Sequence, residues 1–248
     1  MCGIVGYVGH QSACDVVVDA LRRMEYRGYD SAGIALVDGV GKLTVRRRAG
    51  RLSNLESALA DTDPAALAGT TGLGHTRWAT HGRPTDRNAH PHRDAAGKIA
   101  VVHNGIIENF ATLRRELEAA GVEFASDTDT EVAVHLVAQA YHHGETSGDF
   151  AGSVLAVLRR LEGHFTLVFA HADEPGTIVA ARRSTPLVAG IGDGDEPHWF
   201  SVMKAALNLL IGSGVGDPVP PLAAVSPEHL QELTNVLRSL GSLEKQAA

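Results

Sequence analysis

The first residue of this sequence with evident chemical reactivity is a cysteine directly after the initiator methionine. Removal of Met1 would leave Cys2 as the N-terminal residue with a free α-amine. The thiol would then have a pKa of about 8.5, and the amine beside it a pKa of about 8. Because an N-terminal nucleophile can use its own α-amine as the base, Cys2 is a candidate nucleophile that needs no separate histidine. The alternative is an ordinary cysteine at position two. For Cys14, in a helical pattern, we expect only a small buried hydrophobic side chain.

Three further positions carry groups that suit a polar substrate. Asn104-Gly105 is expected in a tight turn after a strand, where a side-chain amide and a backbone N–H could both point at a developing oxyanion. Arg77 has the fork geometry that grips a carboxylate through two oxygens. Asp129 can hold an ammonium group. The alternatives are an ordinary hairpin turn, a surface arginine and an aspartate that stabilises a helix start.

Several conspicuous residues are not expected to bind a metal or a cofactor. Four histidines, His81, His90, His92 and His103, would suit zinc, but no cysteine or carboxylate follows them at a standard ligand spacing. The glycine-rich stretch at 190–194 lacks the register of a dinucleotide-binding loop. We therefore expect no metal and no cofactor, and we interpret the basic run at 46–48 as a solvated strand end.

Short strand patterns alternate with blocks of helix along the chain. Strands are predicted at residues 3–8, 33–38, 42–48, 164–171, 177–182 and 186–191. Asp38-Gly39 has the turn chemistry that joins the second and third of these as a hairpin. Neighbouring strands joined by short turns favour antiparallel sheets with helices inserted in blocks. The pattern therefore predicts an α+β layered domain and not a doubly wound one.

The helices are marked by their ends. A first helix is predicted to begin at Ser12, with Val17, Ala20, Leu21 and Met24 on one face. Residues 53–56 and 128–131 both fit the capping box, in which a hydroxyl and a carboxylate satisfy helix-start amides reciprocally. A third helix is expected at about 108–120, ending at Gly121, and a fourth helical stretch is expected to end at Gly163.

Composition and charge exclude several classes of protein. The chain has 248 residues, of which 44% are hydrophobic and 21% charged, close to an average globular protein. The net charge of −7 argues against a protein that binds nucleic acid through its phosphates. No apolar run reaches the roughly 18 residues of a membrane span, and the N-terminus has no basic signal-peptide region. We expect a cytoplasmic protein with no membrane or nucleic-acid partner.

Five separated motifs follow the terminal Cys-Gly-Ile-Val-Gly. These are Tyr-Arg-Gly-Tyr-Asp-Ser-Ala-Gly at 26–33, His-Thr-Arg-Trp-Ala-Thr-His-Gly at 75–82, Asn-Ala-His-Pro-His at 88–92, His-Asn-Gly at 103–105 and Ser-Asp-Thr-Asp-Thr-Glu at 126–131. In order and spacing, the set resembles the N-terminal glutaminase domain of glucosamine-6-phosphate synthase, a class II glutamine amidotransferase. The resemblance implies a four-layer αββα sandwich of the N-terminal nucleophile hydrolase type.

The resemblance also implies a role for each candidate residue. Cys2 would attack L-glutamine, and Asn104 and Gly105 would form the oxyanion hole. Arg77 and Asp129 would bind the α-carboxylate and α-amine of glutamine. The residues expected to line the pocket are Trp78, Thr80 and His81. The remaining role falls to Arg27, which would lie near Cys2 and favour its thiolate. Phosphoribosyl-pyrophosphate amidotransferases and asparagine synthetases share the cysteine and the Asn-Gly pair, and are the competing class II families.

The resemblance ends near residue 197. We expect a glutaminase domain over residues 1–197 and a divergent helical tail over 198–248, whose last helix begins at Ser226 and ends at Gly241. This tail shows a short resemblance to the C-terminal helices of dihydrodipicolinate synthase-type aldolases. The sugar-phosphate isomerase domains of the family, which would accept the ammonia, are missing from this chain.

Two hypotheses follow. The first is an active glutaminase that releases glutamate and ammonia. The second is a catalytically dead remnant or interaction module whose tail helix packs against a partner through Leu230, Leu233 and Leu237. Both hypotheses are compatible with a homodimer.

Overall fold

The computed structural model describes residues 2–79 and 82–190. The chain divides into two compact units, residues 1–186 and 187–248, and every helix and strand described below belongs to the first. The predicted tail helix and the predicted boundary at residue 197 lie outside the described residues. Among the described residues, no helix combines the length and the apolar character that a membrane crossing requires.

The first sheet contains four antiparallel strands in the order β1-β4-β2-β3. Their bounds are β1 (Gly3–Val8), β2 (Ser31–Asp38), β3 (Leu43–Ala49) and β4 (Gly69–Arg77). Helices α1 (Ala13–Met24) and α2 (Leu52–Ala60) cover its outer face, with short 3-10 helices η1 (Glu25–Arg27) and η2 (Pro64–Leu67) after them. Apolar side chains of α1, α2 and β2 form the core between this sheet and its helices.

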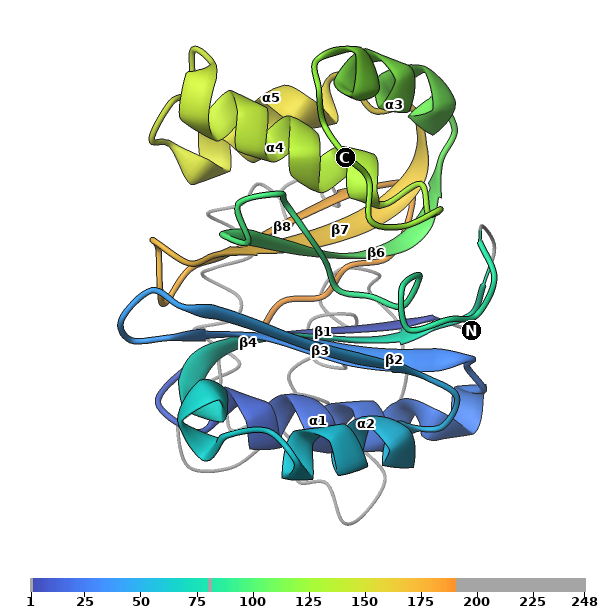
Figure 1. Cartoon of the computed structure of the whole chain (residues 1–248), viewed down its shortest axis with the longest axis vertical. Coiled ribbons are helices and arrows are strands. Elements are labelled where there is room, and N and C mark those ends of the chain that lie inside the picture. Colours follow the sequence, from blue (N-terminus) through green and yellow to red (C-terminus); the bar gives the residue numbers. More distant parts are fainter. Residues whose placement is uncertain (1, 80–81, 191–248) are drawn as a thin grey trace, which may run out of the picture. The chain divides into compact units, whose positions relative to one another are not determined.

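The second sheet also has four antiparallel strands, in the order β5-β6-β7-β8. Their bounds are β5 (His92–Arg93), β6 (Ile99–Ile107), β7 (Gly163–His171) and β8 (Ile178–Arg183). Its outer face is covered by α3 (Phe110–Ala119), α4 (Glu131–His143) and α5 (Phe150–Leu158), as Figure 1 shows. A second core, rich in phenylalanine, valine and leucine, fills the space between them.

The inner faces of the two sheets pack against each other, which gives the helix–sheet–sheet–helix order of Figure 1. Small and branched side chains fill one part of the space between the sheets, among them Val37, Leu73, Val102 and Val168. The predicted α+β class with layered antiparallel sheets and the four-layer sandwich are both confirmed.

Most local predictions are confirmed. The strand predicted at 3–8 has these bounds, and Asp38 begins the tight turn between β2 and β3, where its carbonyl accepts from Gly41 N at 3.3 Å. Ser12 caps α1, since its hydroxyl accepts from Asp15 N, and the predicted apolar face of α1 is buried. The third predicted helix is α3, and Gly121, at φ +86°, follows its last turn.

Four local predictions are wrong. Residues 186–190 form no strand, and Ile191 lies outside the described residues. Gly163 is the first residue of β7 and not a helix end, because α5 already stops at Leu158. Neither capping box forms: α2 begins at Leu52, so Ser53 is already helical, and α4 begins at Glu131 itself.

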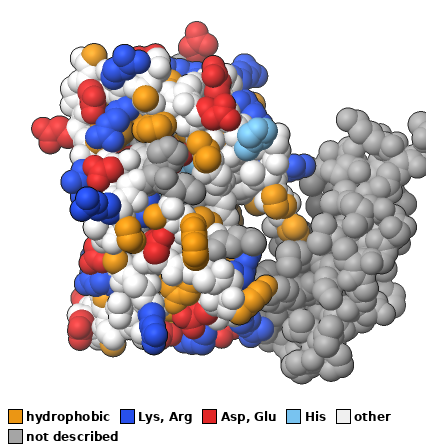
Figure 2. Space-filling model, turned by 90° about the vertical axis from the view of Figure 1, so that its right-hand side faces the viewer, with side chains coloured by type: hydrophobic (Ala, Val, Ile, Leu, Met, Phe, Trp, Pro, Cys, Tyr) orange, Lys and Arg blue, Asp and Glu red, His pale blue; other side chains and the backbone are white. Residues whose placement is uncertain are grey.

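Charged side chains of both signs are interspersed on one face of the described residues. On the face drawn in Figure 2, basic and acidic side chains of the described residues alternate, and hydrophobic ones stand in small separate groups. The described part of this face therefore presents no continuous basic surface of the kind that binds a phosphate backbone.

The close approach of one loop to β2 gives a first prediction. A Cβ atom at Gly33 would lie 2.1 Å from His90 O and 2.8 Å from Arg47 Cβ. We expect Gly33→Ala to lower the free energy of unfolding by about 1–3 kcal/mol, because the His90 backbone must shift. Urea denaturation measures this. Gly39→Ala is the matched control, since nothing lies within 4 Å of a Cβ there, and should change stability by less than about 0.5 kcal/mol. Equal effects in the two variants would contradict the expectation.

Candidate active site

The proposed nucleophile lies at the start of β1, against the end of β4. Antiparallel pairing sets Gly3 opposite Thr76, which brings Cys2 to the end of β4 where Arg77 lies. The Cys2 Sγ atom accepts a hydrogen bond from Trp78 N at 3.1 Å and lies 3.6 Å from Trp78 O. Cys2 is half-buried. The thiol is therefore held by the backbone of the residue that follows β4.

Arg77 is the charged group that connects the predicted site residues. Its side chain is buried, with Nη2 donating to Gly82 O at 3.1 Å and Nη1 lying 3.9 Å from Asp30 Oδ1. Burial lowers the pKa of Arg77, while the charges of Asp30, Cys2 and Asp129 act in the opposite direction. An arginine remains cationic under these conditions. Two other residues predicted from the sequence, Cys2 and Asp129, therefore both lie within electrostatic range of Arg77.

Asp30 is a residue next to the site that the sequence analysis did not single out. Its backbone N–H donates to Arg77 O at 2.7 Å, and its carboxylate accepts from Ala79 N and, at 2.9 Å, from the hydroxyl of Ser31. These bonds fix the backbone on both sides of Trp78, where the Cys2 thiol binds. Its place in the Tyr-Arg-Gly-Tyr-Asp-Ser-Ala-Gly motif was visible in the sequence, but no spacing rule links it to Arg77.

Asp129 is held at the far end of β6. Its Oδ2 atom accepts from Ile107 N at 2.9 Å, and Oδ1 lies 3.5 Å from the hydroxyl of Thr130 and 3.9 Å from His103 Nδ1. Only 4% of the residue is exposed. A buried carboxylate whose hydrogen-bond donors are a backbone N–H and a hydroxyl can also accept from an ammonium ligand.

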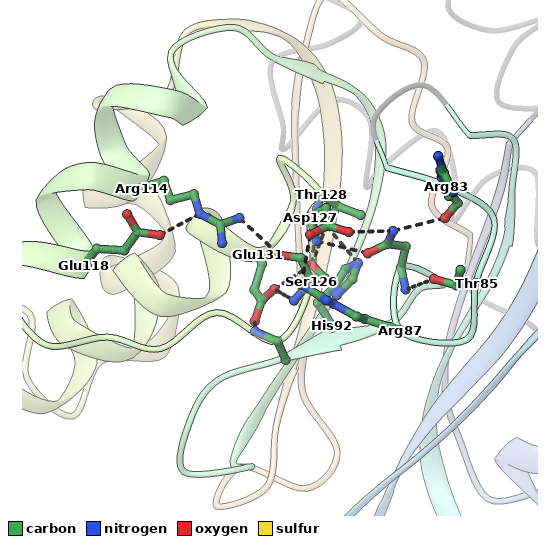
Figure 3. Close-up of polar contacts among 12 residues, drawn as sticks. Arg83, Thr85, Arg87, His92, Arg114, Glu118, Ser126, Asp127, Thr128 and Glu131 are labelled. Carbon is green, nitrogen blue, oxygen red and sulfur yellow. Dashed lines mark hydrogen bonds and ion pairs between the residues drawn. The ribbon is translucent and has the colours of Figure 1, made fainter.

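A second buried carboxylate builds the loop that carries Asp129. Glu131 accepts from the backbone N–H groups of Ala125 and Ser126, both at 2.7 Å, and from the Ser126 hydroxyl at 2.5 Å. Burial raises the pKa of Glu131, but the hydrogen bonds from His135, Ser126 and Ala125 outweigh it and bring the pKa to about 2. The network continues from Ser126 to Thr128 and from there to His92 Nε2, as Figure 3 shows. Glu131 thus orders its own loop and does not cap α4.

The proposed oxyanion donors lie inside a strand, which corrects the predicted turn. Asn104 and Gly105 belong to β6, opposite Thr166 and Phe165 of β7. Gly105 has φ +123°, and a Cβ atom there would lie 2.0 Å from His164 O. Glycine is therefore required at this position both by backbone conformation and by space.

The inter-sheet space near the site is filled with imidazoles. The rings of His75 and His90 stack with centroids 4.3 Å apart, and His92 meets His90 edge-on at 4.7 Å. All three, and also His103, are buried. Within the described residues, no group of three histidine, cysteine or acidic side chains has the geometry to hold a metal ion. Each imidazole is used instead in hydrogen bonds to its neighbours.

The remaining predicted residues are placed less directly. Trp78 is 55% exposed beside the Cys2 thiol, in a position open to a ligand. Arg27 is half-buried in η1, and its effect on Cys2 stays a prediction. Thr80 and His81 lie outside the described residues.

Comparison with known proteins agrees with this geometry. Residues 75–208 match the model of the glutamine amidotransferase domain family. This match covers more than half of the chain, and the chain therefore belongs to that family. The fold and the enzyme class are those of the class II amidotransferases, which have the N-terminal nucleophile hydrolase fold.

The chain is similar to glutamine–fructose-6-phosphate aminotransferase (isomerizing) from several bacteria. It is 84% identical to the Mycolicibacterium paratuberculosis protein over 195 residues, which are 79% of this chain and 31% of that protein. It is 58% identical to the Streptomyces coelicolor protein over the same shares. The chain therefore spans about a third of the length of these relatives.

The solved glutamine phosphoribosyl-pyrophosphate amidotransferase from B. subtilis, in complex with ADP and GMP, is similar at lower identity. It has a TM-score of 0.58 and 25% identity, over 73% of this chain and 37% of that one. The relatives of high sequence identity thus belong to the aminotransferase family, and this competing class II family shares the fold.

The buried imidazoles predict a pH-dependent stability. Burial lowers the pKa of His75 and His92 to about 3 and that of His90 well below 6.5. The unfolded chain, with histidine pKa values near 6.5, binds more protons than the folded one over this interval. The free energy of unfolding should therefore fall as the pH drops through about 6.5 and onward toward about 3. The slope should reach up to about 1.4 kcal/mol per pH unit for each histidine.

Urea unfolding from about pH 7.5 to about pH 5.5 measures this slope. His92→Gln should reduce the slope by about one proton, whereas His10→Gln, at an exposed histidine, should leave it unchanged. A free energy of unfolding that stays constant over this interval would show that the buried rings are not held neutral.

Proposed function

We propose that this chain hydrolyses L-glutamine to glutamate and ammonia, with Cys2 as the nucleophile. The observation that carries the proposal is the convergence of the Cys2 thiol, the buried Arg77 guanidinium and the buried Asp129 carboxylate at one end of the sandwich. An amino acid presents both a carboxylate and an ammonium group, and these two charged side chains complement that pair.

The reaction would proceed through a thioester. With Met1 removed, the α-amine of Cys2 takes the thiol proton, and the thiolate attacks the γ-carboxamide carbon of glutamine. The side-chain N–H of Asn104 and the backbone N–H of Gly105 stabilise the negative oxygen of the tetrahedral intermediate. The proton returns to the leaving nitrogen, which departs as ammonia. Water then attacks the thioester by the same route and releases glutamate and the thiol.

The substrate groups are assigned to the flanking residues. Arg77 binds the α-carboxylate, and Asp129 binds the α-ammonium. Trp78, Thr80 and His81 line the pocket, and Arg27 favours the Cys2 thiolate through its positive charge. A guanidinium has five N–H donors, so the contacts of Arg77 with Gly82 and Asp30 are compatible with a further carboxylate ligand.

The ammonia has a proposed acceptor. The relatives of high sequence identity described above are named aminotransferases of fructose 6-phosphate, and the chain spans about a third of their length. We propose that residues 1–197 form the glutaminase domain, that 198–248 form a separate helical tail, and that a sugar-phosphate isomerase domain accepts the ammonia.

The nucleophile is tested by mass and by turnover together. We expect the chain without Met1 to gain one adduct from an electrophilic glutamine analogue, and to release glutamate from glutamine. Cys2→Ser should lose the adduct and reduce turnover by at least about 100-fold, because the thiolate is the attacking group. Cys14→Ser is the matched control at the buried second cysteine and should retain both.

The outcomes separate the two hypotheses. Glutamate release that persists in Cys2→Ser would overturn the proposed nucleophile. A folded chain without Met1 that takes no adduct and makes no glutamate would favour the catalytically dead remnant instead.

Substrate binding by Asp129 predicts a separate effect on KM. Asp129→Asn removes the charge but keeps the shape, and should raise KM for glutamine by about 10- to 100-fold, the strength of one charge-assisted hydrogen bond. The turnover number should change much less, because Asp129 does not touch the reacting amide. Asp127→Asn is the control, since Asp127 is an exposed carboxylate paired with Arg87. An unchanged KM in Asp129→Asn would assign the ammonium group to another residue.

A further inference from the structure

One imidazole bridges the two sheets beside the proposed oxyanion donors. His75 lies on β4, and its Nε2 atom is 2.9 Å from His103 O and 2.9 Å from Asn104 Oδ1, both on β6. The backbone carbonyl of His103 can only accept, so Nε2 must carry the proton. A protonated Nε2 then requires an acceptor at its second contact as well. The Oδ1 atom of Asn104, and not its Nδ2 atom, must therefore face the His75 ring.

The surroundings of His75 keep it in this form. The residue is 1% exposed, and burial lowers its pKa to about 3, so the ring stays neutral with its single proton on Nε2. The ring is also stacked on His90. Among the described residues, no hydrogen-bond partner reaches the buried Nδ1 atom of His75. An unsatisfied buried acceptor is unfavourable, and an apolar side chain at this position would avoid it. The compensating interaction is the donation from Nε2.

We propose that His75 is a positioning residue that holds the Asn104 carboxamide with its oxygen toward β4 and its Nδ2 donor available to the oxyanion. The inference rests on the proposed glutaminase function. The two ends of a carboxamide have nearly the same size, so packing alone does not select between them. A flipped amide would direct its oxygen lone pairs at the developing negative charge, and would oppose one N–H with another at His75.

The same ring acts on the second donor through the backbone. The carbonyl that His75 binds belongs to the His103–Asn104 peptide, one step before the peptide that carries Gly105 N. On the opposite side of β6, pairing with β7 continues through Asn104 and Gly105. The strand is therefore held from both sides where the two proposed donors lie.

The test is a set of kinetic measurements on the full chain. His75→Leu keeps an apolar volume but removes the donor, and we expect it to lower kcat for glutamine hydrolysis on the order of 100-fold, the effect of losing one oxyanion donor. KM should stay within about threefold, because the ligands of the α-groups are untouched. His75→Gln places an amide N–H near the position of Nε2 and should recover most of the loss.

A double-mutant cycle distinguishes positioning from a general structural role. In an Asn104→Ala background, His75→Leu should lower kcat much less than it does in the unsubstituted chain, because the carboxamide that it orients is gone and only its effect on the backbone before Gly105 remains. The matched control is His171→Leu, at another fully buried histidine at the far end of β7, which should leave kcat unchanged. Full and additive loss in the Asn104→Ala background, or an unaltered kcat in His75→Leu, would overturn the proposal.

A measurement on the unsubstituted protein does not depend on the folding of any variant. Nitrogen NMR of the histidine rings should show His75 with a protonated Nε2 and a bare Nδ1 from about pH 6 to about pH 8. A proton on Nδ1, or titration of the ring in this interval, would refute the proposal. If the unsubstituted chain makes no glutamate, the proposed function fails, whereas the NMR result still decides whether His75 can orient Asn104.

Discussion

The site depends on β6, which extends beyond the end of its neighbouring strand β5. Between β5 and β6, pairing is limited to His92 with Val101 and Arg93 with Ala100. The next residue of β6 that faces this side is His103, whose backbone groups lie deep in the sandwich and need partners. Two imidazoles supply them: His103 N donates to His90 Nδ1 at 3.2 Å, and His103 O accepts from His75 Nε2. Side-chain hydrogen bonds thus replace the backbone pairing beyond the end of β5. Among the described residues, the proposed oxyanion donors lie next to an edge of β6 that no strand pairs with.

This use of imidazoles in place of a paired strand explains why one part of the space between the sheets is apolar and another part is polar. Where strands pair on both sides, backbone groups satisfy one another and the side chains between the sheets are apolar, as around Leu73 and Val102. Beyond the end of β5, imidazole rings are needed as hydrogen-bond partners. The rings of His75 and His90 have centroids 4.3 Å apart, and this stacking requires the backbone of His90 to approach the first sheet closely. Gly33 provides that approach on the opposite sheet, since the His90 carbonyl occupies the place of a Cβ atom. The Ser-Ala-Gly motif of β2 and the His-Pro-His motif are therefore two sides of one contact.

The local structure could be predicted well from the sequence, and the polar core poorly. Ser12 and the apolar spacing after it predict α1 correctly, and the Asp38-Gly39 step predicts its hairpin, because both depend on neighbours in the chain. Asn104-Gly105 suggests a turn by the same local rules, but pairing with β7 over the whole length of β6 overrides them. Glu131 likewise suits a capping box, whereas its oxygens bind a loop whose position follows from tertiary packing. The proposed role of His75 could not be predicted from the sequence for a related reason, since its partners lie 28 and 29 residues away on the other sheet.

The charges of the site also limit what it binds productively. Arg77 is buried with Asp30 nearby, and buried Asp129 accepts from Ile107 N, so these three side chains together carry one more negative charge than positive. The zwitterionic α-groups of glutamine add one charge of each sign and leave this balance unchanged. The product glutamate carries a second carboxylate, which would add a further negative charge to this group of side chains. Repulsion there opposes rebinding of glutamate while leaving the amide unaffected, since the neutral carboxamide carries no charge into the pocket. The same electrostatics that bind the substrate therefore favour release of the product.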